Sequence, residues 1–149
     1  MRKHILVVDD DPCVLAMIRP MLERAGHAVA TTDCGHDALR ALETGGFDVL
    51  ITDIFMPSMD GLELIQFVCS RDLNTAIIAV SAGSAMVGHD LLSTSLALGA
   101  DMTLTKPIAP ASLVQAVDRV VIDRSNGLRL RNAEHFSQSS AKVQAGETA

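Results

Sequence analysis

The chain has 149 residues, 48% hydrophobic and 20% charged, so its length and composition fit one globular domain with a buried core. The formal charge of the chain is −6, and residues 1–122 hold 15 acidic residues against 8 basic ones, which argues against a broad basic surface for nucleic acid. No apolar run approaches the roughly 20 residues that cross a bilayer, and no signal peptide is evident, so we expect a cytoplasmic protein without membrane contact.

Short apolar runs alternate five times with segments of helical periodicity. This alternation predicts an α/β fold in which helices cover both faces of a parallel sheet. Strands are expected near 4–9, 28–32, 47–53, 76–81 and 102–105, and helices near 12–25, 35–44, 60–71, 85–98 and 109–122.

Individual residues indicate where the first helix begins and where the folded domain ends. Asp11 can cap the first helix and Pro12 suits its first turn, whereas Pro20 inside the segment should kink it. From Arg124 the apolar periodicity fades, so we expect residues 1–123 to form the domain and residues 124–149 to form a polar, disordered C-terminal tail.

Three cysteines, Cys13, Cys34 and Cys69, lie far apart in helix-like segments. Their odd number and wide spacing indicate neither a disulfide framework nor a zinc site. We expect all three to be packing residues.

Charged and hydroxyl residues stand where four of the apolar runs end: Asp9 and Asp10, Asp53, Ser81 and Lys106. Parallel strands gather their carboxyl ends at one edge of an open sheet, where such folds bind ligands, so these residues are expected to form one site. The three carboxylates repel one another, so either a proton or a cation is expected among them. An all-oxygen site open to water suits Mg²⁺.

Carboxylates, a divalent cation, a lysine and a hydroxyl are the groups that phosphoryl transfer requires. The pattern therefore predicts phosphate chemistry at an aspartate. The alternative interpretation is that Asp9, Asp10 and Asp53 merely cap the helices that follow them.

Four runs resemble the receiver domain of bacterial two-component response regulators: Leu6 to Asp11, Thr52 to Gly61, Val80 to Ala82 and Thr105 to Pro107. The resemblance covers about residues 3–122. It implies a flavodoxin-like, doubly wound sheet of five parallel strands in the order 2-1-3-4-5 with five surrounding helices. Since no output domain follows, the chain resembles the single-domain regulators of chemotaxis and phosphorelays.

The resemblance also implies roles for individual residues. Asp53 would accept phosphate from a phosphohistidine on a sensor histidine kinase or histidine phosphotransfer protein. Asp10, Asp53 and the backbone carbonyl of Phe55 would hold Mg²⁺, and Asp9 would hold it through water. Lys106 would pair with the phosphoryl group or, without it, with Asp53, and Ser81 would turn toward a phosphoryl oxygen.

Further properties follow from the same resemblance. It implies a cis peptide bond before Pro107, a downstream protein effector, no DNA-binding domain and a monomer or weak dimer. The chain would catalyse only its own phosphorylation.

The sequence departs from the family pattern at three places. Thr103 stands where an aromatic switch residue is usual, which puts the conventional readout in doubt. The segment from Ser81 to Gly99 is long and rich in small and hydroxyl residues, which predicts a long or mobile loop before the fourth helix. Phe55 places an apolar ring at the rim of the site, where we hypothesise that it prolongs the phosphorylated state.

Two other functions would use the same residues in a different way. A haloacid-dehalogenase-like phosphatase would use Asp9 as its nucleophile, but Cys13 stands where that motif has Thr or Val, and no acidic pair follows Lys106. A receiver-like interaction module would signal without being phosphorylated. The competent residues at all five positions rank it below the active form.

Overall fold

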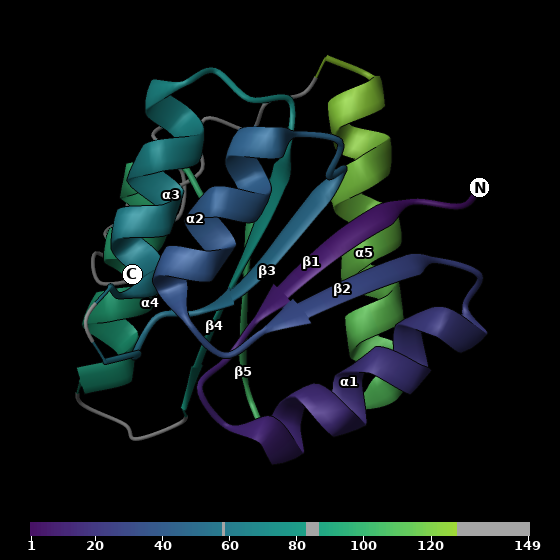
Figure 1. Ribbon diagram of the computed structural model, residues 1–149, viewed down its shortest axis with the longest axis horizontal. Coiled ribbons are helices and arrows are strands. Elements are labelled where there is room, and N and C mark those ends of the chain that lie inside the picture. Colours follow the sequence, from purple (N-terminus) through teal and green to yellow (C-terminus); the bar gives the residue numbers. More distant parts are fainter. Residues whose placement is uncertain (58, 83–86, 128–149) are drawn as a thin grey trace, which may run out of the picture.

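The computed structural model describes residues 1–57, 59–82 and 87–127, and the side chains of all of these except 87–92 (Figure 1). Five strands alternate with five helices, as the sequence predicts. They are β1 (His4–Val8), α1 (Pro12–Arg24), β2 (Ala28–Thr32), α2 (Gly35–Thr44), β3 (Val49–Asp53), α3 (Gly61–Ser70), β4 (Ala76–Ala82), α4 (Val87–Leu98), β5 (Met102–Lys106) and α5 (Pro110–Ser125).

The strands form one parallel sheet in the order β2-β1-β3-β4-β5, which confirms the predicted doubly wound topology. The register aligns Val8 of β1 with Thr52 of β3, and Asp53 of β3 with Val80 of β4. The residues that follow β1 and end β3 and β4 therefore meet at the same edge of the sheet.

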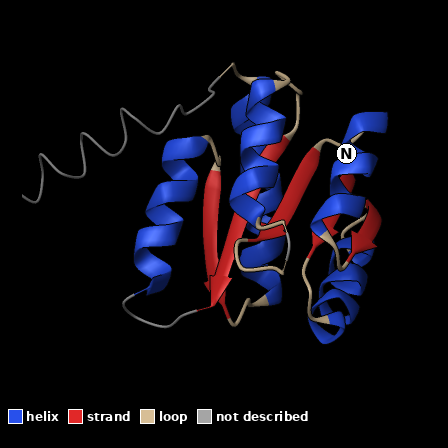
Figure 2. Cartoon of the chain, turned by 60° about the vertical axis from the view of Figure 1, so that its left-hand side comes forward, coloured by secondary structure: helices blue, strands red, loops and turns tan. Residues whose placement is uncertain are grey.

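Alternate side chains along the strands enter two separate cores. Ile5 and Val7 of β1 point into a core covered by α1 and α5, and Leu6 and Val8 point into the opposite core, covered by α2, α3 and α4. Figures 1 and 2 show the strands lying between these two helical layers. All five residues of β3 are buried, as expected for a central strand with helices on both faces.

Two acidic residues beside the strand ends begin the helices that follow. The Asp11 side chain accepts a hydrogen bond from the Cys13 amide at 2.9 Å, as predicted for α1. In the same way, Asp60 caps α3 by accepting from the Glu63 amide at 3.0 Å. Each cap fixes the turn between a strand end and its helix.

The fifth helix continues three residues beyond its predicted end, to Ser125. Arg124, assigned to the polar tail from the sequence, belongs to this helix, and its Nη2 lies 3.1 Å from Oδ2 of Asp101. The two side chains are only 13% and 11% exposed. The prediction failed here because the partner that allows an arginine to be buried lies 23 residues away.

Two other expectations concern parts of the chain outside the described residues. The predicted loop before the fourth helix includes residues 83–86, and most of the predicted tail is residues 128–149. The predicted start of that helix at residue 85 also falls there, and α4 is described from Val87.

The prediction that all three cysteines are packing residues is wrong for Cys13 and Cys69, which are exposed, whereas Cys34 is half-buried. Cys13 occupies the open first turn of α1, and the end of α3 leaves Cys69 at the surface beside Gly99. Helical periodicity alone does not reveal this, because cysteine is small enough for either position.

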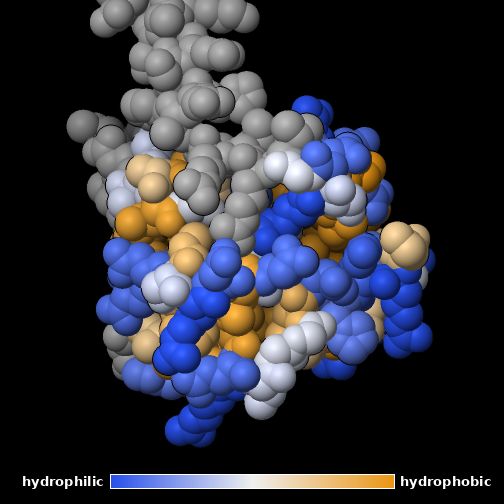
Figure 3. Space-filling model, turned by 90° about the horizontal axis from the view of Figure 1, so that it is seen from above, coloured by the Kyte–Doolittle hydropathy of each residue, from blue (hydrophilic) through white to orange (hydrophobic). Residues whose placement is uncertain are grey.

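The end of the molecule opposite the strand carboxyl ends has a mixed surface, on which hydrophobic residues show between hydrophilic ones (Figure 3). A pocket of about 110 Å³ lies among residues that include Lys3, Asp48 and Arg124. Lys3 and Asp48 precede β1 and β3, so this pocket lies away from the acidic strand ends. Within the described part of the chain, no helix combines the length and hydropathy needed to cross a membrane.

Candidate functional site

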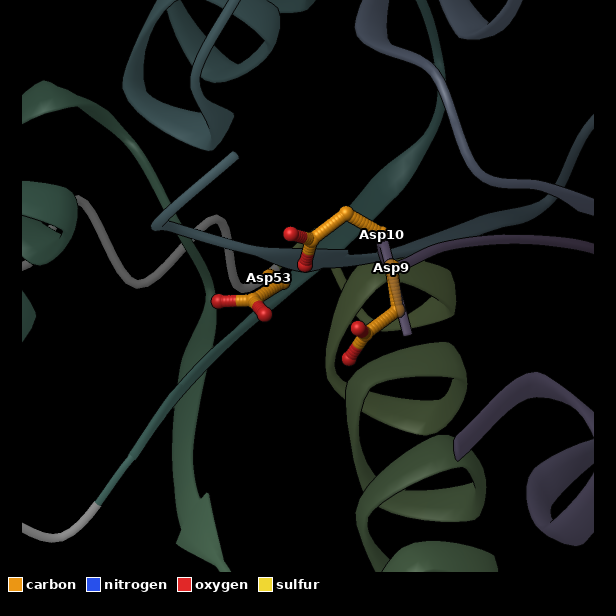
Figure 4. A group of neighbouring side chains, drawn as sticks. All are labelled: Asp9, Asp10 and Asp53. Carbon is orange, nitrogen blue, oxygen red and sulfur yellow. The ribbon is translucent and has the colours of Figure 1, made fainter. Parts of the chain in front are cut away.

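Three carboxylates gather at the carboxyl edge of the sheet, as the sequence predicts. Asp9 and Asp10 follow β1, and Asp53 ends the neighbouring strand β3 (Figure 4). One carboxylate oxygen from each lies within 4.8 Å of the others. Asp9 and Asp53 are buried and Asp10 is exposed, so the cluster opens to solvent on the side of Asp10.

Lys106, the last residue of β5, reaches across to this cluster. Its Nζ lies 2.7 Å from Oδ2 of Asp9 and 2.9 Å from Oδ2 of Asp53. The pairing with Asp53 matches the role that the family resemblance gives the lysine before phosphorylation. The pairing with Asp9 is slightly closer, and the sequence does not predict it, because the sequence does not show which of two adjacent aspartates turns toward β5.

The surroundings oppose the negative charge of Asp53. Burial raises the pKa of this carboxyl, the hydrogen bond from Lys106 lowers it, and the nearby charge of Asp9 raises it further, with a net shift upward. Burial alone would lower the pKa of Lys106, but hydrogen bonds and charges from Asp9 and Asp53 outweigh burial and raise it. The lysine is therefore held as a cation between two carboxylates.

Backbone hydrogen bonds hold both buried carboxylates in place. The amide of Asp11 donates to Oδ1 of Asp9 at 2.9 Å, and the amide of Phe55 donates to Oδ1 of Asp53 at 3.0 Å. In each case the chain turns directly after the strand, so an amide two residues later faces the carboxylate. With Lys106 on the other oxygen of each, the two side chains have little rotational freedom.

Ser81 is fully buried near the end of β4, and its Oγ donates to the carbonyl of Ala82 at 3.3 Å. Thr103, at the family's aromatic switch position, is half-buried on β5 and pairs in register with Ala79. Phe55 is 53% exposed, which agrees with the predicted apolar ring at the rim. The peptide bond between Lys106 and Pro107 is cis, as the resemblance implies.

Two glycines support the site in a way that the sequence did not reveal. A Cβ on Gly61 would collide with the carbonyl oxygen of Asp53, and a Cβ on Gly35 would lie 2.6 Å from the carbonyl oxygen of Met59. In the sequence, Gly61 is part of a family motif and Gly35 marks the start of a predicted helix. In both cases the requirement for glycine depends on the backbone that packs opposite, which is distant in sequence for Gly35.

The donor set fits a hard divalent cation. Carboxylate oxygens from three residues converge within 4.8 Å, and in the described part of the chain Lys106 is the cation that pairs with them. Mg²⁺ is commonly held by a few carboxylates and completes its octahedral shell with waters, which the open side at Asp10 can admit. The arrangement thus suits a site that combines a metal-binding face with a buried carboxylate nucleophile.

The sequence matches the model of the response regulator receiver domain over residues 5–118. It is 34% identical over 125 residues to the alkaline phosphatase synthesis transcriptional regulatory protein PhoP of Bacillus subtilis, and 37% identical over 135 residues to the sensor histidine kinase GacS of Pseudomonas protegens. These alignments cover 84% and 87% of this chain but 50% and 14% of those proteins. The chain thus spans half or less of the length of these two relatives.

Solved structures give the same result. The chemotaxis response regulator CheY4 of Vibrio cholerae is 30% identical with a TM-score of 0.71, over 80% of this chain and 99% of that one. The receiver domain of the sensor histidine kinase PA1611 of Pseudomonas aeruginosa is 25% identical with a TM-score of 0.73, over 81% and 98%, and it holds a magnesium ion in its active-site cleft. Sequence, topology and site geometry agree that the chain belongs to the response regulator receiver domain family.

Proposed function

We propose that this chain is a phosphoacceptor that receives a phosphoryl group on Asp53 from a phosphohistidine of a sensor histidine kinase or histidine phosphotransfer protein. The observation that carries the proposal is the convergence of the Asp9, Asp10 and Asp53 carboxylates, with Lys106 Nζ within 2.9 Å of both buried ones. A structural role in helix capping needs no such convergence. It also does not account for a lysine that reaches over from β5.

In the proposed reaction, an Asp53 carboxylate oxygen attacks the phosphorus of the phosphohistidine. The nitrogen–phosphorus bond breaks, the histidine nitrogen leaves with the bonding electrons, and an acyl phosphate forms on Asp53. Lys106 lies 2.9 Å from Oδ2 of Asp53, so it is placed to pair with the phosphoryl group as charge moves onto the transferred oxygens.

Asp10, Asp53 and the Phe55 backbone carbonyl would hold Mg²⁺, and Asp9 would reach it through water. When bound, the cation supplies positive charge that offsets carboxylate repulsion and stabilises the phosphoryl oxygens. The fit rests on the three converging carboxylates and the solvent access at Asp10.

Phosphorylation would be reported through Ser81. Among the described residues, its Oγ bonds to the adjacent Ala82 carbonyl at the long distance of 3.3 Å, so a phosphoryl oxygen can replace this bond at small cost. Thr103 offers no ring to swing between buried and exposed positions. The proposed output is therefore a backbone movement at Ser81 and Ala82, read by a downstream protein effector.

We further propose that the protein acts in the cytoplasm as a monomer or weak dimer. The receiver domain would occupy residues 1–123 on the sequence boundary, with α5 extending it to Ser125. It would turn over no substrate besides its own phosphorylation.

The decisive experiment is incubation with Mg²⁺ and a small acyl-phosphate donor, followed by intact-mass measurement. We expect a gain of one phosphate in the wild type and in the exposed control variant Asp37→Ala, and no gain in Asp53→Ala. A wild type that gains no phosphate under forcing conditions overturns the proposal and favours an interaction module. Turnover of a phosphate ester that survives Asp53→Ala but is lost in Asp9→Ala would instead indicate a phosphatase.

A further inference from the structure

Gly35, the buried first residue of α2, lies directly against the loop that follows the phosphoacceptor strand. A Cβ built on Gly35 would lie 2.6 Å from the carbonyl oxygen of Met59 and 2.8 Å from its Cβ. Cβ atoms essentially never approach other atoms within 3.0 Å. The helix and the loop therefore touch at backbone distance only because residue 35 has no side chain.

The loop that Gly35 contacts joins β3 to α3 and carries Phe55. Its first turn is held by the Phe55 amide on Asp53 Oδ1, and its far end by the Gly61 amide on the Ile54 carbonyl, both at 3.0 Å. The Met59 amide also donates to the Pro57 carbonyl at 2.9 Å. Through the bond from Met59 to Pro57, a displacement at Met59 is passed back along the loop toward Phe55.

The start of α2 is itself fixed to the edge of the sheet that carries the acidic residues. The Cys34 amide donates to Oγ1 of Thr32 at 3.3 Å, and the Ala38 amide donates to the Cys34 carbonyl at 3.0 Å. The carbonyl of Thr32 accepts from the amide of Asp9 at 3.2 Å. The start of α2, which packs against Met59, is thus linked by hydrogen bonds to the end of β1, where Asp9 and Asp10 lie.

We propose that Gly35 is a positioning residue for the divalent cation. By letting α2 rest against Met59, it sets the place of the Phe55 carbonyl relative to Asp10 and Asp53. This inference rests on the proposed function, in which that carbonyl is the third protein ligand. An alanine at position 35 must push Met59 outward, which displaces the carbonyl but leaves the carboxylates on their strands.

The test is a Mg²⁺ titration of the full ¹⁵N-labelled chain without any phosphodonor, followed by NMR at the amides of Asp10 and Phe55. We expect Gly35→Ala to need about tenfold more Mg²⁺ for half-saturation. This is at the low end of the range seen when residues that position metal ligands are substituted. His36→Ala alters the next, exposed residue of the same helix and should bind Mg²⁺ like the wild type.

Urea unfolding of each variant separates positioning from general destabilisation. A folded Gly35→Ala with wild-type Mg²⁺ affinity overturns the inference, even if its unfolding free energy is lower. Should Gly35→Ala not fold, Met59→Ala decides, because it loosens the same contact without adding an atom. We expect weaker Mg²⁺ binding in that variant, and wild-type affinity would overturn the inference.

The outcomes also separate this inference from the proposed function. Normal phosphorylation of the wild type, together with unchanged Mg²⁺ binding in the variants, removes the role of Gly35 alone. A wild type that binds no Mg²⁺ and gains no phosphate removes both.

Discussion

At the scale of single residues, Asp53 is a carboxylate whose charge is opposed by its surroundings. Burial and the charge of Asp9 raise its pKa, although Lys106 pulls it down. The folded state therefore binds the proton more tightly than the unfolded state, whose pKa lies near the ordinary 3.8. Between the ordinary and the raised pKa the folded state holds more protons, so this group makes stability fall as pH rises.

Removing the charge of Asp53 should therefore stabilise the protein above its ordinary pKa. In the absence of divalent cations, Asp53→Asn should raise the free energy of unfolding at pH 7, and its advantage over the wild type should grow as pH rises from about 4. Lys106 keeps Asp9 as a partner at 2.7 Å, so the substitution does not leave it unpaired. Urea unfolding across this pH range measures the effect. A variant less stable than the wild type at pH 7 would show that the Lys106 bond outweighs burial.

The second prediction concerns Phe55. Its ring is 53% exposed two residues after Asp53, where we expect it to hinder the water that hydrolyses the acyl phosphate. Phe55→Asn should therefore lose phosphate faster than the wild type, measured by intact mass after the donor is removed. Ile122→Asn changes an equally exposed apolar residue near the far end of α5 and should have no effect. Rapid loss from the wild type, unchanged by Phe55→Asn, would contradict the hypothesis.

At the scale of elements, the turns after β1 and β3 are set by aspartates that cap the next helix. Asp11 and Asp60 each accept an amide hydrogen bond, at 2.9 and 3.0 Å. Such bonds satisfy donors that a helix start would otherwise leave without an intrahelical partner. The acidic edge of the sheet is thus framed by helices whose first residues are fixed close to the strand ends.

The third prediction tests this capping at α3. Asp60→Ala should lower the free energy of unfolding by about 1 kcal/mol, because the Glu63 amide loses its acceptor. Asp60→Asn keeps a side-chain oxygen at the same place and should stay close to the wild type. Urea unfolding of both variants measures the two changes in unfolding free energy. Equal losses in both variants would show that the charge of Asp60, and not the cap, stabilises the turn.

At the scale of the whole molecule, the ion pair of Arg124 with Asp101 ties the end of α5 to the start of β5. Asp101 Oδ2 also accepts from the amide of Ile77 at 2.8 Å, so one carboxylate links α5, β4 and β5. Nε and Nη1 of Arg124 are buried with no hydrogen-bond partner among the described residues. The last turn of α5 is therefore part of the folded domain.

The fourth prediction places the end of the domain. Arg124→Ala should lower the free energy of unfolding by about 3 kcal/mol, since it leaves Asp101 largely buried without its cation. Arg119→Ala removes an arginine of the same helix that is 73% exposed and 3.9 Å from Asp123, and should change stability by less than about 0.5 kcal/mol.

Truncated chains provide the complementary measurement. A chain that ends at Gly127 should unfold like the full chain, whereas one that ends at Asp123 should show the loss seen in Arg124→Ala. Equal stability of the two truncated chains would contradict the assigned role of Arg124.

The resemblance to the receiver family implied the order of the sheet. The sequence by itself determined the alternation of strands and helices and the meeting of Asp9, Asp10, Asp53, Ser81 and Lys106 at one edge. It did so because hydrophobic periodicity and the parallel winding rule are local or topological properties, and strand ends can be read directly from the chain. The caps at Asp11 and Asp60 involve amides two and three residues away, so local geometry suffices for them as well.

Only the tertiary structure decided which groups need a distant partner. Lys106 could be assigned to Asp53 from the family pattern, but its second bond to Asp9 depends on how β5 lies relative to β1. Burial of Arg124 depends on Asp101, and the need for glycine at position 35 depends on Met59. Whether a position needs a charged partner or a glycine depends on the residue that packs against it. For these residues, folding brings that neighbour close from a distant part of the chain.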